Sequence, residues 1–163
     1  MITEIGEYIV GAYLKLILKC DFIDYNVRPP GGGLKGLQEL DVIGLDFKES
    51  TAYLCEVTTH IRGLLYVTNK ETLIRIAKKH RVQKDYAKKY LKTFSNIQYS
   101  FWSPVVPVGI LTEGLRKIDG LELIINGKYK KCIGKLRAEA KSITHDTGNP
   151  FFRMLQIVEH MRD

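Results

Sequence analysis

Two carboxylates stand inside apolar segments of the chain, where a charge is costly unless something compensates it. Asp41 is flanked by apolar residues in the stretch ELDVIGLD, and Glu56 is flanked by apolar residues in LCEVTTH. The segment from Glu39 to His60 therefore predicts a β-hairpin with one acid in each strand. Carboxylate oxygens are the ligands that hard divalent cations prefer, so two such acids on neighbouring strands suggest a shared cation.

The expected position of the hairpin turn allows the pairing of the strands to be predicted. A turn centred between Lys48 and Glu49 places Asp41 directly opposite Glu56, with Cβ atoms about 5 Å apart. Like charges placed that way repel each other unless a metal bridges them. Because side chains alternate along a strand, Thr58 is expected on the same face as Glu56.

The pattern of an acid in one strand followed by Glu56-Val57-Thr58 in the next resembles the PD-(D/E)XK nuclease superfamily. The RecB-like and Holliday-junction-resolvase-like branches are the most similar. Glu7, on an expected first helix in GEYIVGAYLK, corresponds to a helix acid that helps to hold the metal in such families. The resemblance covers about residues 3–110.

The resemblance implies a fold, a reaction and a set of metal ligands. The fold would be α/β, with a restriction-endonuclease-like αβββαβ core, a mixed central sheet flanked by helices, and further helices at the C-terminal end. The reaction would be hydrolysis of DNA phosphodiester bonds with Mg²⁺ or Mn²⁺. Asp41, Glu56 and the Val57 carbonyl would bind the metal, while Glu7 and Thr58 would complete the catalytic site. Waters and the scissile phosphate would fill the octahedral shell.

One position departs from the superfamily pattern, because Thr58 stands where the motif has a lysine. That lysine normally contacts the scissile phosphate or the attacking water. A threonine hydroxyl can donate a hydrogen bond to either of them, but it supplies no positive charge. Lys35 in the glycine-rich loop, or Lys78 or Lys79 on a basic helix, are the candidates to replace it.

Hydrophobic periodicity and turn residues predict the elements that would position these groups. Helices are expected at 3–19, 69–94 and 128–143, with a last helix that begins at Asn149-Pro150. Strands are expected at 22–28, in the hairpin at 37–59, at 97–101 and 105–111 around Pro104, and at 121–125. The order helix, three strands, helix, strand is that of the αβββαβ core.

The helix expected at 69–94 carries most of the positive charge of the chain. It holds two acids, Glu71 and Asp85, and nine basic residues: Lys70, Arg75, Lys78, Lys79, Arg81, Lys84, Lys88, Lys89 and Lys92. Such an excess of one sign favours contact with phosphates. The resemblance places Gln83 and Tyr86 near the DNA as well, although the tyrosines of this helix fit a core face equally well. The expected nucleic-acid-binding residues are Lys35, Lys78, Lys79, Gln83, Lys84 and Tyr86.

Composition restricts the class of protein. The chain has 163 residues, 45% of them hydrophobic, and a formal net charge of +7, which fit one domain (1–163) that binds nucleic acid. Within it, the core would span about 3–110, and a strand and helices would follow at 111–163. No apolar run of about 18 residues and no signal-peptide pattern are found, so no membrane partner is expected. Three cysteines without CxxC spacing suggest buried thiols and a cytoplasmic protein.

Three functions stay open on the residues alone. The first is a metal-dependent endonuclease, for which a homodimer would pair two sites for double-strand cutting. The second is a catalytically degenerate nuclease-fold protein that binds DNA without cutting it, which Thr58 favours. The third is a subunit of a larger nucleic-acid-processing assembly, with the helices after Leu121 as its contact surface.

Overall fold

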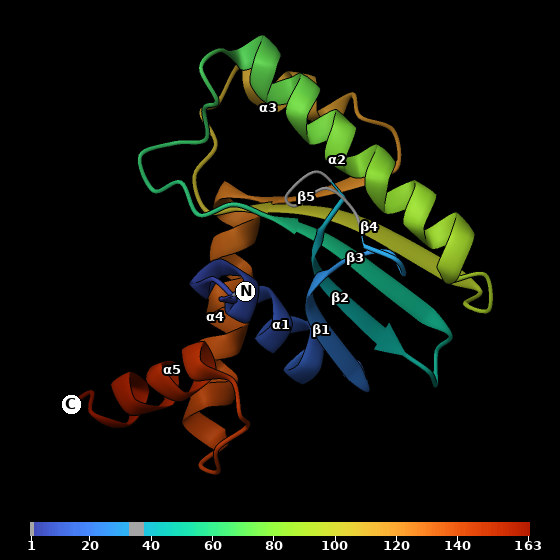
Figure 1. Ribbon diagram of the computed structural model, residues 1–163. Coiled ribbons are helices and arrows are strands. Elements are labelled where there is room, and N and C mark those ends of the chain that lie inside the picture. Colours follow the sequence, from blue (N-terminus) through green and yellow to red (C-terminus); the bar gives the residue numbers. More distant parts are fainter. Residues whose placement is uncertain (1, 33–37) are drawn as a thin grey trace.

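The chain folds into an α/β structure in which helices cover both faces of a mixed five-stranded sheet (Figure 1). The computed structural model describes residues 2–32 and 38–163. In chain order the elements are α1 (Ile5–Leu16), β1 (Phe22–Val27), β2 (Leu40–Asp46), β3 (Thr51–Val57), α2 (Asn69–Tyr90), β4 (Asn96–Ser103), α3 (Ile110–Arg116), β5 (Leu121–Ile125), α4 (Asn126–Ser142) and α5 (Pro150–His160).

The strands lie in the sheet in the order in which they occur in the chain. Strands β1, β2 and β3 form an antiparallel meander, while β4 pairs parallel to β3 and β5 pairs parallel to β4. Parallel neighbours need a crossover connection, which α2 supplies between β3 and β4 and α3 supplies between β4 and β5. The parallel half of the sheet therefore depends on two helices, α2 (the basic helix) and α3.

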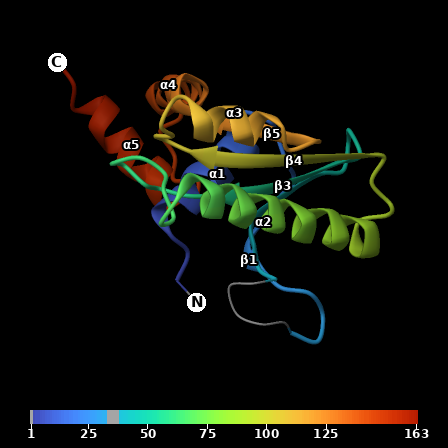
Figure 2. The ribbon, with the colours of Figure 1, turned by 90° about the horizontal axis from the view of Figure 1, so that it is seen from above.

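The two faces of the sheet bury different sets of apolar side chains. Helices α2 and α3 cover one face and α1, α4 and α5 cover the other (Figures 1 and 2). Consecutive strand residues point to opposite faces, so Leu54 packs towards α2 whereas Cys55 packs towards α1 and α4. Phe101 and Trp102 divide in the same way on β4. This alternation sends Glu56 to the same face as Leu54, below α2.

The predicted α/β fold with a mixed sheet between helices is confirmed, and so is the register of the hairpin. Val42 pairs with Cys55 and Asp46 pairs with Thr51, which is the register of a turn centred between Lys48 and Glu49. The last helix begins as expected, because the Asn149 side chain accepts a hydrogen bond of 2.9 Å from the Phe152 N–H. No helix of the described ranges is both long and apolar enough to cross a membrane.

The strand expected at 105–111 is wrong. Strand β4 ends at Ser103, and the segment after Pro104 is a loop that leads into α3. The backbone N–H and C=O of Val106 bind the side chain of Asn126 at 2.7 and 2.9 Å instead of a neighbouring strand. Pro104 and Pro107 have no N–H to give to a ladder. The first helix is also shorter than expected, because it ends at Leu16 and Lys19 has a positive φ of 61°.

Candidate active site

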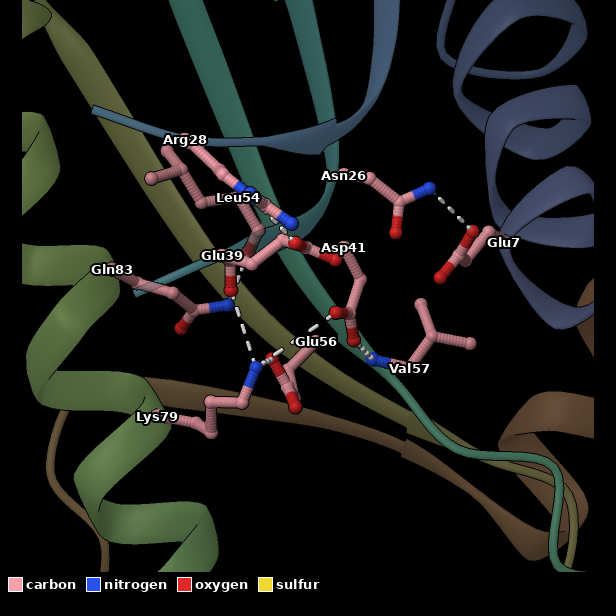
Figure 3. Close-up of polar contacts among 10 residues, drawn as sticks. All are labelled: Glu7, Asn26, Arg28, Glu39, Asp41, Leu54, Glu56, Val57, Lys79 and Gln83. Atoms are coloured by element: carbon pink, nitrogen blue, oxygen red, sulfur yellow. Dashed lines mark hydrogen bonds and ion pairs between the residues drawn. The ribbon is translucent and has the colours of Figure 1, made fainter. Parts of the chain in front are cut away.

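Asp41 and Glu56 lie beside each other at the end of the hairpin, on adjacent strands, as the sequence predicted (Figure 3). They border a polar cleft of about 360 Å³, which Glu7, Thr58 and Lys79 also line. One oxygen of Asp41 accepts a hydrogen bond of 2.8 Å from the Val57 N–H, which fixes the carboxylate against β3. The other oxygen of Asp41 faces Glu56 and Lys79.

Lys79 of α2 reaches both carboxylates across the cleft (Figure 3). Its Nζ lies 3.3 Å from Glu56 Oε2 and 3.9 Å from Asp41 Oδ1, and it donates a hydrogen bond of 3.2 Å to the Glu39 carbonyl. The Glu39 side chain in turn binds Arg28 at 2.9 Å. Of the two candidate lysines that the structure describes, Lys78 and Lys79, Lys79 is therefore the one beside the acids.

The position of Lys79 depends on how α2 is docked against the sheet. One turn further along the helix, Gln83 is fully buried, and its Nε2 donates a hydrogen bond of 3.1 Å to the Leu54 carbonyl on β3. The His80 Nε2 lies 2.9 Å from the Asp119 carbonyl and its Nδ1 lies 3.3 Å from Gln83 Oε1, and both oxygens are acceptors. These bonds set the rotation of α2 about its axis. Gln83 was expected at the DNA surface, and the structure places it in the interior as an anchor of the helix.

The two carboxylates of the site outnumber the ammonium group that is paired with them. Burial raises the pKa of Glu56 well above its ordinary value; the neighbouring Asp41 raises it further, and Lys79 opposes both. Burial also raises the pKa of Asp41, against the lowering effects of Lys79 and the Val57 N–H. Two ionised carboxylates and one ammonium group carry a net charge of about −1. A proton or a metal cation would compensate the remaining charge.

Glu7 enters the cleft from α1, on the other side of Asp41 (Figure 3). Its carboxylate accepts hydrogen bonds from the Glu4 N–H at 2.9 Å and from Asn26 Nδ2 at 3.1 Å. Burial raises the pKa of Glu7, these two bonds lower it, and Asp41 raises it slightly. Within residues 2–32 and 38–163, no three acids, histidines or cysteines lie close enough to hold a metal together. Glu7 thus lines the same cleft as the acids, but its carboxylate is hydrogen-bonded to Glu4 and Asn26.

Thr58 has a buried hydroxyl that finds no hydrogen-bond partner among the described residues. It lines the same cleft as Asp41 and Glu56. A buried polar group without a partner is costly, so this hydroxyl is available to a group that enters the cleft. Two carboxylates and a hydroxyl around a polar cleft suit an oxygen-preferring cation that keeps several waters, such as Mg²⁺ or Mn²⁺.

The other residues expected to bind nucleic acid are spread over different sides of α2. Lys78 and Lys84 are exposed on the outer surface of the helix. Tyr86 is half-buried and stacks on Tyr90, with ring centroids 4.9 Å apart, while also packing on the core below α2. Lys35 lies outside the described residues. The outer side of α2 is therefore the basic surface, and the side that bears Lys79 faces the acids.

Two groups at the cleft escaped the sequence analysis. Arg75 was counted only as one basic residue among nine, although its spacing of four from Lys79 could have placed the two on one side of the helix. Tyr66 lies in the loop before α2, and no pattern in the sequence marks it. Both line the cleft with the acids.

Comparisons with protein-family models, with curated proteins and with solved structures gave no match for this chain. The chemistry of the cleft is therefore inferred from its own residues.

Proposed function

We propose that the protein is a metal-dependent endonuclease that hydrolyses DNA phosphodiester bonds, with a fold like that of the PD-(D/E)XK nucleases. The observation that carries this proposal is the pair of buried carboxylates, Asp41 and Glu56, with one ammonium group in reach of both. The order of elements, α1 to β4, supports it because it is the αβββαβ order of those nucleases.

Lys79 takes the part of the missing motif lysine in this proposal. It approaches the acids from α2 rather than from β3, and its Nζ lies 3.3 Å from Glu56. From there an ammonium group can orient the attacking water and stabilise the negative charge that develops on the phosphate. Thr58 donates its hydroxyl proton to the phosphate or to a water, which satisfies a group that otherwise lacks a partner.

Asp41, Glu56 and the Val57 carbonyl would hold Mg²⁺ or Mn²⁺, and Glu7 would support them from α1. The metal would acidify a bound water and neutralise charge on the phosphate. Asp41 is already oriented for this task by the Val57 N–H at 2.8 Å. A cation beside Glu56 would favour its ionised form and oppose the rise in pKa that burial and Asp41 cause.

The outer surface of α2 would bind the DNA backbone. Lys78 and Lys84 are exposed there, and the helix, which ends at Tyr90 and so leaves out Lys92, carries eight basic residues against two acids. Contacts of this kind act on the phosphates and do not select a sequence. Tyr86, on the edge of the same helix, is the candidate for contact with a base or sugar.

The test is an incubation of the protein with supercoiled, linear, branched and single-stranded DNA, in Mg²⁺ or Mn²⁺ and in EDTA. Asp41→Ala removes a proposed ligand. Lys131→Ala, on the far side of the sheet at an exposed position of α4, is the matched control for an ordinary surface change. The proposal expects metal-dependent cutting by the wild type and the control, and none by Asp41→Ala. No cutting of any DNA in either metal would contradict it.

A second function is favoured by one specific observation. Lys79 already compensates part of the charge of both acids, and no third acid, histidine or cysteine of the described residues joins them. A protein of this fold that binds nucleic acid without cutting it would have the same geometry. Such a protein would bind DNA equally well in EDTA and in Mg²⁺, and would show no saturable binding of Mn²⁺.

A further inference from the structure

Arg75 lies one helical turn before Lys79, so both side chains leave α2 on the side that faces the cleft. The guanidinium carbon of Arg75 stands 4.0 Å from the centre of the Tyr66 ring. Arg75 is exposed, and it forms no ion pair with any carboxylate of the described residues. Lys79 forms ion pairs with the two acids. Arg75 instead lies over the Tyr66 ring and forms no ion pair with a described residue.

Hydrogen bonds fix the backbone at Tyr66, and a neighbouring ring packs against its side chain. The Tyr66 N–H donates a hydrogen bond of 2.8 Å to Thr72 Oγ1, and the Tyr66 carbonyl accepts one of 2.7 Å from the Thr68 N–H. Val67, between them, adopts a positive φ of 61°. The ring of His60 packs edge-on against Tyr66, with centroids 5.1 Å apart. The loop thus presents a fixed aromatic platform to Arg75.

Charge varies along the cleft. Arg75 and Tyr66 line the same cleft as the acids and Lys79, and Arg75 lies one turn before Lys79 on α2. Burial raises the pKa of Tyr66; Arg75 lowers it, and Glu56 and Asp41 raise it. The Tyr66 ring, with Arg75 over it, lines the same cleft as the two acids.

We propose that Arg75, held flat by Tyr66, binds the phosphate that adjoins the scissile phosphate on the same nucleic-acid strand. This inference rests on the proposed function, because it needs a strand in the cleft. Side chains one turn apart on a helix lie on one face with Cβ atoms about 5–6 Å apart, and a nucleic-acid strand presents its phosphates in an unbroken row. Two cationic groups at the Arg75–Lys79 spacing therefore suit neighbouring phosphates. A stacked guanidinium keeps its N–H donors free to bind a phosphate with two parallel bonds.

Binding is measured first, without metal, so that the result does not depend on cleavage. A fluorescein-labelled single-stranded oligonucleotide and its duplex are titrated in EDTA with the wild type, Arg75→Ala, Arg75→Lys, Tyr66→Phe and Tyr66→Leu. Lys131→Ala is the control for loss of one positive charge elsewhere. Arg75→Ala is expected to raise Kd about tenfold. It should also shallow the salt dependence by about one slope unit.

The other variants distinguish hydrogen bonding of a phosphate by the guanidinium on Tyr66 from non-specific electrostatic attraction. Arg75→Lys keeps the charge but not the planar fork, so its Kd should fall between those of the wild type and Arg75→Ala. Tyr66→Phe keeps the ring and should bind like the wild type, whereas Tyr66→Leu should weaken binding about threefold. Equal Kd and salt slope for Arg75→Ala, Lys131→Ala and the wild type would overturn the inference.

Kinetics in Mg²⁺ or Mn²⁺ then locate the contact. A contact to a phosphate that does not react is made equally in the ground state and in the transition state, so Arg75→Ala should raise KM and leave kcat within about twofold. A large fall in kcat with KM unchanged would place Arg75 on the reacting phosphate and overturn the assignment. If no variant cuts but Arg75→Ala weakens binding, the nuclease proposal fails and the phosphate contact stands.

Discussion

Two buried acidic sites of the molecule carry opposite imbalances of charge. Glu159, on α5, has a side chain that is 1% exposed, and three cationic groups surround it: Arg137 at 2.6 Å, Arg162 at 3.5 Å and Lys141 at 3.8 Å. Among the residues that the structure describes, Asp41 and Glu56 share one ammonium group, that of Lys79. One site has more cations than acids, and the other has more acids than cations.

The shortage of cations at the cleft is reflected in the raised pKa of Glu56. Burial and mutual repulsion raise the pKa of Glu56, and Lys79 alone does not reverse the shift. The cations around Glu159 are half-exposed, so they reach a nearly buried carboxylate and stay hydrated themselves. Such a cluster joins α5 to α4 and needs no further ion. A buried acid is thus no sign of a metal site by itself, and what marks the cleft is the uncompensated charge.

The largest expected effect is loss of cleavage when either acid of the cleft is removed. Asp41→Ala and Glu56→Ala each delete a proposed metal ligand, so the rate should fall about 100-fold or more. Binding of DNA in EDTA should stay within about threefold of the wild type, because the basic surface of α2 is unchanged. Gel assays measure the loss of cleavage, and fluorescence anisotropy measures the affinity for DNA. Weaker binding that matches the loss of cleavage would instead indicate misfolding of the hairpin.

Lys79→Ala is expected to separate metal binding from catalysis. Without the ammonium group the cleft is more negative, so Mn²⁺ should bind more tightly, while the cleavage rate should fall about tenfold to 100-fold. Adding Thr58→Lys to this variant restores a lysine at the superfamily position, and should recover activity to within about tenfold of the wild type. Calorimetry with Mn²⁺ and single-turnover kinetics measure both. Full activity in Lys79→Ala would show that Lys79 only neutralises the acids.

Glu159→Gln should affect stability and nothing else. It removes a charge that three half-exposed cations share, and the expected cost is about 1–2 kcal/mol in the free energy of unfolding. Cleavage and Mn²⁺ binding should match those of the wild type. Urea unfolding at neutral pH gives the free energy. A changed affinity for Mn²⁺ would mean that the two acidic sites are coupled, contrary to the comparison made above.

The smallest expected effect is the pH dependence of stability in EDTA. The pKa of Glu56 is higher in the folded protein than its ordinary value of 4.5, so the folded state holds more protons than the unfolded state above that pH. Stability should therefore fall as the pH rises from about 4.5 through the raised pKa. Glu56→Gln should flatten this part of the profile and raise Tm at neutral pH. Tm is measured as a function of pH from about 4.5 upwards for both proteins. The same slope of Tm against pH in Glu56→Gln would exclude Glu56 as the cause.

Local patterns in the sequence were enough to predict the acid pair. Strand side chains alternate with a period of two, so a turn between Lys48 and Glu49 allowed only one register with both acids on the same face. The cap at Asn149 was predicted for a similar reason, because its side chain bonds within its own turn. Both features depend on residues that are close in the sequence.

Features that depend on packing between distant elements were not predicted. The sequence offered Lys35, Lys78 and Lys79 equally, because the rotation of α2 is set by Gln83 on the Leu54 carbonyl. The segment at 105–111 has the apolar residues of a strand, yet Asn126 occupies the backbone groups of Val106.

Titration of Mn²⁺ into the wild type, Glu56→Gln and Glu159→Gln tests most directly whether uncompensated charge makes the cleft a metal site. Isothermal calorimetry in two buffers of different ionisation enthalpy also reports the protons released on binding. We expect saturable binding of about one ion per chain in the wild type and Glu159→Gln, with proton release, and loss of binding in Glu56→Gln. The same weak heats in all three proteins would contradict the account.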